Sequence, residues 1–306
     1  MGSLLKSIAA LPHLGETLSA ASALVWAVAV ILFRICGRTV PALAMSLFKN
    51  ILAGLLLLLT LAALGLPLLP PLPFKNYALM FLSGVVGIAI SDTLFFVALN
   101  KLGAELTAIV DCAYAPFVIG LSFLFLDERI NPVQSGGVVL IVGAVLLISG
   151  RRGEAQIPRR DLRTGIALGI LSMFISAGGV VIMKPLLAED SLVWAGLVRT
   201  VGGAVSIALV LAFHPKRRAI LAPLASGRTL ALLVPAAVLS AYISMVLWMG
   251  GMKYTQASIA SALNQLNTIF IFILAAVFLK EKITPSKLTA VALAFAGAML
   301  VSIPFK

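Results

Sequence analysis

Long stretches without a charged residue dominate this chain. Six segments contain no Asp, Glu, Lys or Arg: residues 50–74, 130–150, 164–183, 229–252, 254–279 and 288–305. Further apolar stretches carry few charges. Because a helix that crosses a bilayer needs about 20 apolar residues, the pattern predicts ten transmembrane helices. Their expected limits are 18–37, 41–65, 76–99, 103–126, 132–150, 164–187, 191–213, 230–252, 256–279 and 284–304.

Composition excludes the main alternatives to an all-α polytopic membrane protein. The chain is 61% hydrophobic and only 11% charged, with a mean hydropathy of +1.12, which rules out disorder and disfavours a soluble two-domain enzyme. Runs of consecutive leucines do not alternate as β-barrel strands do. The net charge of +12 fits basic cytoplasmic loops. Without a basic-aromatic module, we expect no nucleic-acid partner.

One motif occurs twice, which indicates an internal repeat. Leu126–Pro132 and Leu279–Pro285 share the pattern Leu-x-Glu-basic-Ile-x-Pro at an offset of 153 residues, and near the start of each half an offset of 150 pairs Lys49 with Arg199. Each unit holds five helices, an odd number, so the second unit is expected to be inverted in the membrane. Inverted repeats are typical of secondary transporters, with the substrate site at the repeat interface.

The repeat divides the chain into four expected parts. They are an N-terminal tail or interfacial helix, a first five-helix repeat, a basic connecting loop and a second, inverted five-helix repeat, at residues 1–17, 18–150, 151–163 and 164–304. The Lys and Arg residues of the loops gather on one side of this topology. The positive-inside rule then places both termini outside. Arg34 and Lys184, near helix ends, are expected to extend toward the membrane surface.

The ten helices, the paired turn motifs and the basic residue early in helices 2 and 7 resemble the drug/metabolite transporter superfamily, in particular its EamA-like branch. The resemblance covers residues 18–304. It implies export or exchange of small metabolites such as amino acids, frequent proton coupling, and a cavity lined by helices 1–4 and 6–9. It also implies a multi-pass protein of a prokaryotic inner membrane, as a monomer or homodimer. Ile269 replaces the proline that matches Pro116, so helix 9 is expected to be straighter than helix 4.

Charged residues inside the spans locate a candidate site. Lys49 and Asp111 lie about eight residues after the start of helices 2 and 4, and Asp92 lies about eight residues before the end of helix 3. These three helix ends are expected on the same membrane side, so all three residues are expected at a depth of about 12 Å from it. Ionisable groups inside a membrane usually face a cavity or a partner. One interpretation is substrate binding and proton coupling. The other is a structural ion pair of Lys49 with one aspartate, although one lysine cannot neutralise both acids.

The second repeat lacks these acids and has Met245 and Asn264 at the matching positions. Its polar residues either bind a ligand or join helices through hydrogen bonds, and the aromatic residues either line the cavity or pack. Glu128 and Glu281, in the two repeated turns, are expected to pair locally or to cap a helix. The candidate substrate-binding or coupling residues are Asp92, Asp111, Lys49, Arg199, Asn264, Gln265, Tyr114, Trp26 and Ser244.

The sequence thus predicts a secondary active transporter that exports a small metabolite, an amino acid or related compound, by alternating access, with proton coupling as one option. The alternative is a membrane-embedded hydrolase that acts on a lipid or peptide through Asp92 and Asp111. The expected partners are the substrate, protons and membrane lipids. We expect no cofactor, and no metal because His13 and His214 have no ligand spacing.

Overall fold

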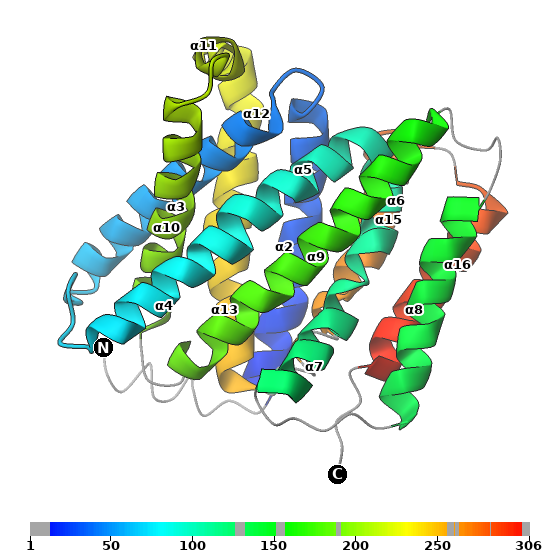
Figure 1. The fold of residues 1–306 in the computed structure, drawn as a ribbon, viewed down its shortest axis with the longest axis horizontal. Coiled ribbons are helices and arrows are strands. Elements are labelled where there is room, and N and C mark those ends of the chain that lie inside the picture. The colour runs from blue at the N-terminus through cyan, green and yellow to red at the C-terminus, as the bar shows by residue number, and fades with distance from the viewer. Residues whose placement is uncertain are drawn as a thin grey trace.

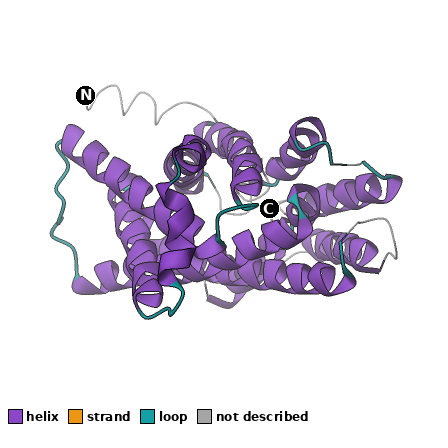
Figure 2. Ribbon diagram, turned by 90° about the horizontal axis from the view of Figure 1, so that it is seen from above, coloured by secondary structure: helices purple, strands orange, loops and turns teal. Residues whose placement is uncertain are grey.

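The structure, a computed structural model, describes residues 13–125, 132–150, 157–187, 191–255, 260, 263–281 and 283–301. Within these residues the chain forms helices and connecting turns, with no β-strand (Figures 1 and 2). Seven segments are long and apolar enough to cross a membrane: Leu14–Cys36, Ala42–Ala63, Phe74–Leu102, Ala104–Phe125, Arg159–Leu187, Leu192–Ala212 and Gly227–Tyr254. These segments match seven of the expected spans to within a few residues.

The other three expected spans fall on shorter apolar stretches, Pro132–Ala144, Leu266–Phe278 and Pro285–Leu300. The count of ten crossings therefore stays a prediction. Pro132 and Pro285 are the first residues of α8 and α16, as expected for a residue that has no N–H to donate. Large apolar side chains such as Leu55 and Leu59 are more than half exposed, as suits a surface that faces lipid rather than water. The part of the chain that the structure describes is all helical, and its seven apolar segments are those of a multi-pass membrane protein.

The described residues of the first half, up to residue 150, form seven α-helices and one π-helical segment. These are α2 (Leu14–Cys36), α3 (Ala42–Ala63), α4 (Phe74–Gly84), η1 (Val85–Ile90), α5 (Ser91–Leu102), α6 (Ala104–Asp111), α7 (Tyr114–Phe125) and α8 (Pro132–Gly150). The second half, from residue 157, contains α9 (Arg159–Leu187), α10 (Leu192–Ala212), α11 (Arg217–Leu221), η2 (Ala222–Ala225), α12 (Gly227–Ala237), η3 (Val238–Ser244), α13 (Met245–Tyr254), α15 (Leu266–Phe278) and α16 (Pro285–Val301).

Two long helices contain π-helical turns at equivalent places. η1 lies between α4 and α5, and η3 lies between α12 and α13. Val85 and Val238, the first residues of η1 and η3, are related by the offset of 153 residues. The repeat found in the sequence therefore includes the π-helical turn. A π-turn slips the backbone hydrogen bonds by one residue and is common at functional sites.

Two other helices are interrupted at equivalent places. α6 ends at Asp111 and α7 begins at Tyr114, because the chain tightens into turns whose amides bond three residues back and because Pro116 has no N–H. A turn at Gln265 precedes α15, and the Thr268 amide bonds to the Gln265 carbonyl at 3.0 Å. A tightened turn thus interrupts helix 9 without a proline, and the expectation that helix 9 is straighter than helix 4 stays a prediction.

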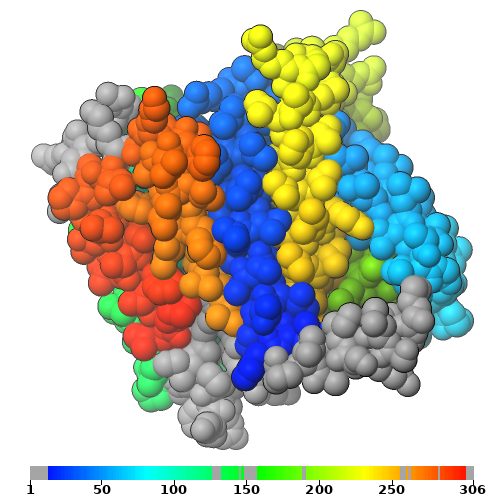
Figure 3. Space-filling view, turned by 180° about the vertical axis from the view of Figure 1, so that it is seen from behind, coloured from blue at the N-terminus to red at the C-terminus, as the bar shows by residue number. Residues whose placement is uncertain are grey.

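The two halves interlock rather than lie side by side as separate bodies. α2 packs between α15 and the α12–η3–α13 helix, as Figure 3 shows in blue, orange and yellow. In the equivalent arrangement, α9 packs between α7 and the α4–η1–α5 helix. α3 packs on α10, and α8 packs on α16 at one side of the bundle (Figure 1). The interior between the halves is the place where equivalent residues of both repeats meet.

The charged residues near two helix ends satisfy carbonyl groups instead of extending to the membrane surface. Arg34 donates to the Leu99 and Asn100 carbonyls at 3.0 and 2.9 Å. Lys184 donates to the Met252 carbonyl at 2.8 Å. Leu99 and Met252 are related by the offset of 153. The expectation for Arg34 and Lys184 is therefore corrected, because carbonyl groups in the last turn of a neighbouring helix lie within their reach.

Candidate functional site

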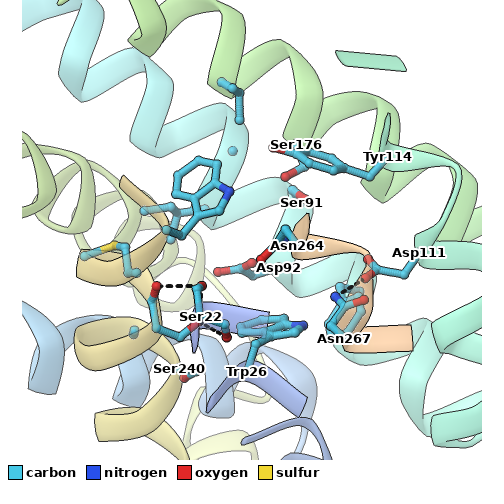
Figure 4. A pocket seen from close by; sticks show the side chains of 18 of the residues that line it. Ser22, Trp26, Ser91, Asp92, Asp111, Tyr114, Ser176, Ser240, Asn264 and Asn267 are labelled. Carbon is cyan, nitrogen blue, oxygen red and sulfur yellow. Dashed lines mark hydrogen bonds between the residues drawn. The ribbon is translucent and has the colours of Figure 1, made fainter. Parts of the chain in front are cut away.

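A cavity of about 170 Å³ lies between the two halves (Figure 4). Most of its wall consists of residues that the repeat offsets relate to one another. Nine pairs contribute to it: Trp26 with Ser176, Lys49 with Arg199, Gly87 with Ser240, Ile88 with Ala241, Ser91 with Ser244, Asp92 with Met245, Phe95 with Trp248, Asp111 with Asn264, and Tyr114 with Asn267. The cavity thus lies where the repeats meet.

One cation and one acid on the cavity wall neutralise each other. Lys49, on α3, forms an ion pair with the Asp92 carboxylate at the start of α5. Lys49 is only 5% exposed, so its charge needs this partner inside the membrane. The structural interpretation of Lys49 is therefore the one that its geometry favours.

Asp111, the last residue of α6, also lines the cavity. Its carboxylate accepts a hydrogen bond of 3.0 Å from the Asn267 side chain of α15, as Figure 4 shows. No salt bridge involves Asp111 within the described part of the chain. The break between α6 and α7 brings this carboxylate to the cavity, because Asp111 and Tyr114 lie on its two sides.

Arg199 is the cation that the second half contributes. It is 5% exposed, and its guanidinium carbon lies 5.7 Å from the centre of the Trp248 ring. This contact is a cation–π interaction. In the described residues no carboxylate pairs with Arg199, and its Nε has no hydrogen-bond partner. The cavity therefore holds a buried guanidinium whose charge is not balanced by an ion pair.

The structure brings eight of the nine candidate residues to the cavity. Tyr114 is buried, and its hydroxyl has no partner among the described groups. Trp26 packs on Phe95 with ring centres 5.8 Å apart. Gln265 is buried at the turn before α15 and is absent from the residues that line the cavity. The eight that line it are Lys49, Asp92, Asp111, Trp26, Tyr114, Arg199, Ser244 and Asn264.

Sequence reasoning included Ser244 but missed Ser22, Ser91 and Ser172, which form two serine pairs with it at or beside the cavity. Ser22 and Ser244 exchange side-chain hydrogen bonds with each other's carbonyls at 2.9 and 3.2 Å. Ser91 and Ser172 do the same at 3.0 and 2.8 Å. The offsets carry Ser22 onto Ser172 and Ser91 onto Ser244. The recurrence of serine at equivalent positions of the two repeats could have identified them, because in an apolar repeat a recurring serine is rarer than a recurring leucine.

No group of three or more His, Cys, Asp or Glu side chains is arranged to hold a metal ion among the residues described. The cavity instead offers one ion pair, a separate carboxylate, a separate guanidinium, amides and indole rings. This mixture is suited to binding a small polar molecule.

Comparison with known proteins agrees with this architecture. The model of the EamA-like transporter family matches the chain twice, over residues 13–150 and 163–303. A solved structure, described only as a crystal structure of a protein, superposes with a TM-score of 0.68 over 93% of this chain and 95% of that chain, at 17% identity. That similarity shows a shared fold. No protein with a curated description matches the sequence. Because the family model covers both halves, the chain belongs to the EamA-like transporter family, whose members are membrane transporters of the drug/metabolite type.

Proposed function

We propose that the protein is a secondary transporter that carries a small metabolite through the cavity by alternating access. The observation that carries the proposal is that nine equivalent residue pairs, one member from each half, line the same cavity. A site at the interface of two repeats can be exposed to either side when one repeat rocks against the other. The family match supports transport and gives no support to a hydrolase.

The proposed architecture is ten membrane spans in two inverted five-helix repeats, residues 18–150 and 164–304, joined by the basic loop 151–163. The two family matches support this division. The equivalent π-turns and helix breaks also support it, because an odd number of spans in each unit must invert the second unit. The proposed location is a prokaryotic inner membrane, with the protein crossing it many times.

The charges on the cavity wall favour a zwitterionic substrate. Lys49 and Asp92 neutralise each other, which leaves Arg199 and Asp111 to meet opposite ends of a ligand. A guanidinium binds a carboxylate through two parallel hydrogen bonds. Asp111 would accept an ammonium group in place of Asn267. The volume of about 170 Å³ is below the roughly 300–1,000 Å³ of pockets for drug-sized ligands, so an amino acid or related compound fits the site best.

Export driven by a proton gradient is the proposed direction and coupling. A carboxylate inside a membrane can bind and release a proton as its surroundings change between two conformations. Asp111 is the better candidate for this step, because Asp92 is already paired with a cation. The experiment below tests coupling separately from substrate choice.

The test is uptake and counterflow in proteoliposomes with and without an imposed pH gradient. Amino acids, amines lacking the carboxylate and carboxylates lacking the amine are offered separately. We expect the zwitterions to move, Arg199→Met to reduce amino-acid transport at least tenfold, and Asp111→Asn to abolish its dependence on the gradient. Asp161→Asn, which changes a partly exposed acid far from the cavity, is the control. Amino-acid transport that is equal in the wild type and in Arg199→Met, or transport of amines as fast as that of amino acids by the wild type, would contradict the assignment of the substrate.

A further inference from the structure

The repeated turn motif has a role that the cavity does not explain. Its second copy contains Glu281, which lies in the turn between α15 and α16 of the second half. The Glu281 carboxylate accepts hydrogen bonds from the backbone amides of Ala104 and Glu105 at 3.2 and 3.3 Å. These amides are the free N–H groups at the start of α6, in the first half. Glu281 therefore caps a helix of the other half instead of pairing locally.

The local backbone is shaped for this contact on both sides. Lys280 adopts a left-handed conformation with φ of 54°, and the Glu281 amide bonds to the Ala275 carbonyl at 3.3 Å, so the chain turns back over the end of α15. A non-glycine residue in this conformation carries strain. On the other side, Gly103 has φ of 85°, and a Cβ there would lie 3.1 Å from the Glu281 carboxylate. The turn thus directs the Glu281 side chain toward the first residues of α6, and the absence of a side chain at Gly103 leaves space for the Glu281 carboxylate.

A second contact between the halves adjoins the first. Glu105, whose side chain is fully buried, forms an ion pair with Lys287 of α16. Lys101 pairs with Asp161 at the start of α9, with side chains that are 33% and 40% exposed. All of these contacts lie at the end of the bundle where α11 is found, at the top of Figure 1, which we call the α11 end. The two halves are fastened to each other there.

The helix that Glu281 caps is also the helix that reaches the cavity. α6 is only eight residues long, and the break after Asp111 separates it from α7. Asn267 of α15 holds its inner end through the Asp111 carboxylate at 3.0 Å. Thr268 contacts the Ala108 carbonyl at 3.3 Å in between. α6 is therefore a short helix of the first half that the second half holds at both ends.

We propose that Glu281 is the latch of a gate at the α11 end, and that α6 is the moving part of that gate. The inference rests on the proposed transport function. When a ligand group takes the place of Asn267 at Asp111, the inner end of α6 loses this attachment to α15. At the outer end, Glu281 still holds the free backbone amides, and the Glu105–Lys287 ion pair joins the helix to α16. Release of the Ala104 and Glu105 amides then allows α6 to move away from α15 and opens the cavity toward the α11 end.

The test measures access to the cavity rather than transport. Ser176→Cys, on the cavity wall, is the reporter in a protein that carries Cys36→Ala and Cys112→Ser. A membrane-impermeant methanethiosulfonate reagent is added from each side of sealed vesicles, and Arg217→Cys in a parallel sample identifies the α11 side. We expect Glu281→Ala to raise the labelling rate from the α11 side about tenfold or more, with a smaller increase for Glu281→Gln, which keeps one acceptor oxygen.

Asp161→Asn is the matched control, because it removes another charged contact between the halves at the same end but a more exposed one. We expect it to change the labelling rate less than twofold. An unchanged rate in both Glu281 variants would overturn the proposal. An equal increase in Asp161→Asn would also overturn it, because the effect would then be a general loosening of that end.

A reversible lock guards against misfolding of these variants. Ala104→Cys with Glu281→Cys, joined by a short bifunctional thiosulfonate, should suppress labelling of the reporter from the α11 side, and reduction should restore the access. Labelling that persists in the joined protein would contradict the latch. Because no substrate is needed, the latch and the transport function can fail separately: a Glu281 effect without transport of any compound refutes only the function, and transport without a Glu281 effect refutes only the latch.

Discussion

Removal of the Asp92 carboxylate is expected to destabilise the protein through the lysine that it leaves behind. Lys49 is 5% exposed, and Asp92 is its ion-pair partner. Breaking a buried pair by removing one member costs about 3–5 kcal/mol. The Asp92 side chain is 18% exposed and asparagine keeps one acceptor oxygen, so we expect Asp92→Asn to lower the free energy of unfolding by about 3 kcal/mol, at the lower end of that range.

The assay is unfolding in mixed micelles with increasing SDS, followed by circular dichroism. Lys49→Met combined with Asp92→Asn removes both charges, so we expect the double variant to recover about 2 kcal/mol relative to Asp92→Asn alone. Asp161→Asn, which breaks a pair with partly exposed side chains, should cost about 1 kcal/mol or less. The reasoning is refuted if Asp92→Asn costs no more than Asp161→Asn, or if the double variant recovers nothing.

Three further outcomes can be measured with the same protein. Gly179→Ala places a methyl group 2.7 Å from the backbone of the facing helix and should cost about 1–3 kcal/mol in SDS unfolding, whereas Gly178→Ala meets no atom within 4 Å and should stabilise the helix by about 0.5–1 kcal/mol. Ser22→Ala and Ser172→Ala should each cost about 0.6 kcal/mol, and a difference above about 1 kcal/mol would contradict their equivalence. Met245→Asp gives the second-half guanidinium a carboxylate partner, so amino-acid binding measured by isothermal titration should weaken about tenfold or more, while Met245→Leu should leave it nearly unchanged.

The spans and the central position of the site could be predicted because they depend on patterns along the chain. Charge-free length fixes where a helix can cross a membrane, so the ends of α3 and α10 fall within two residues of the expected limits. Depth follows from residue counts, which is why Lys49, Asp92 and Asp111 were expected near one another. The structure places all three on the cavity wall.

The remaining features depend on packing between the halves, which has no pattern of its own in one sequence. Uniformly apolar helices do not indicate which face points inward, so Gln265 was expected at the cavity although it lies outside the wall. The π-turns have no residue signature comparable to proline, and the break at Gln265 occurs without one. The capping of α6 by Glu281 joins residues about 177 positions apart, and only the folded chain brings them together.

The duplication explains the scaffold, but the chemistry of the site depends on the pairs whose members differ. If Met245 were an aspartate like its equivalent Asp92, each half would hold a neutralised ion pair, and the Asp111 carboxylate would be the one separate charge that the described cavity wall offers a ligand. Because only the first half carries the acids, Arg199 lacks an ion-pair partner among the described residues while Asp111 provides a negative group on another wall. One positive and one negative group in a symmetric scaffold allow a zwitterionic ligand to bind in one orientation. The positions at which the two repeats differ therefore give the site one positive and one negative end. The equivalent residues around them can support the rocking of one repeat against the other.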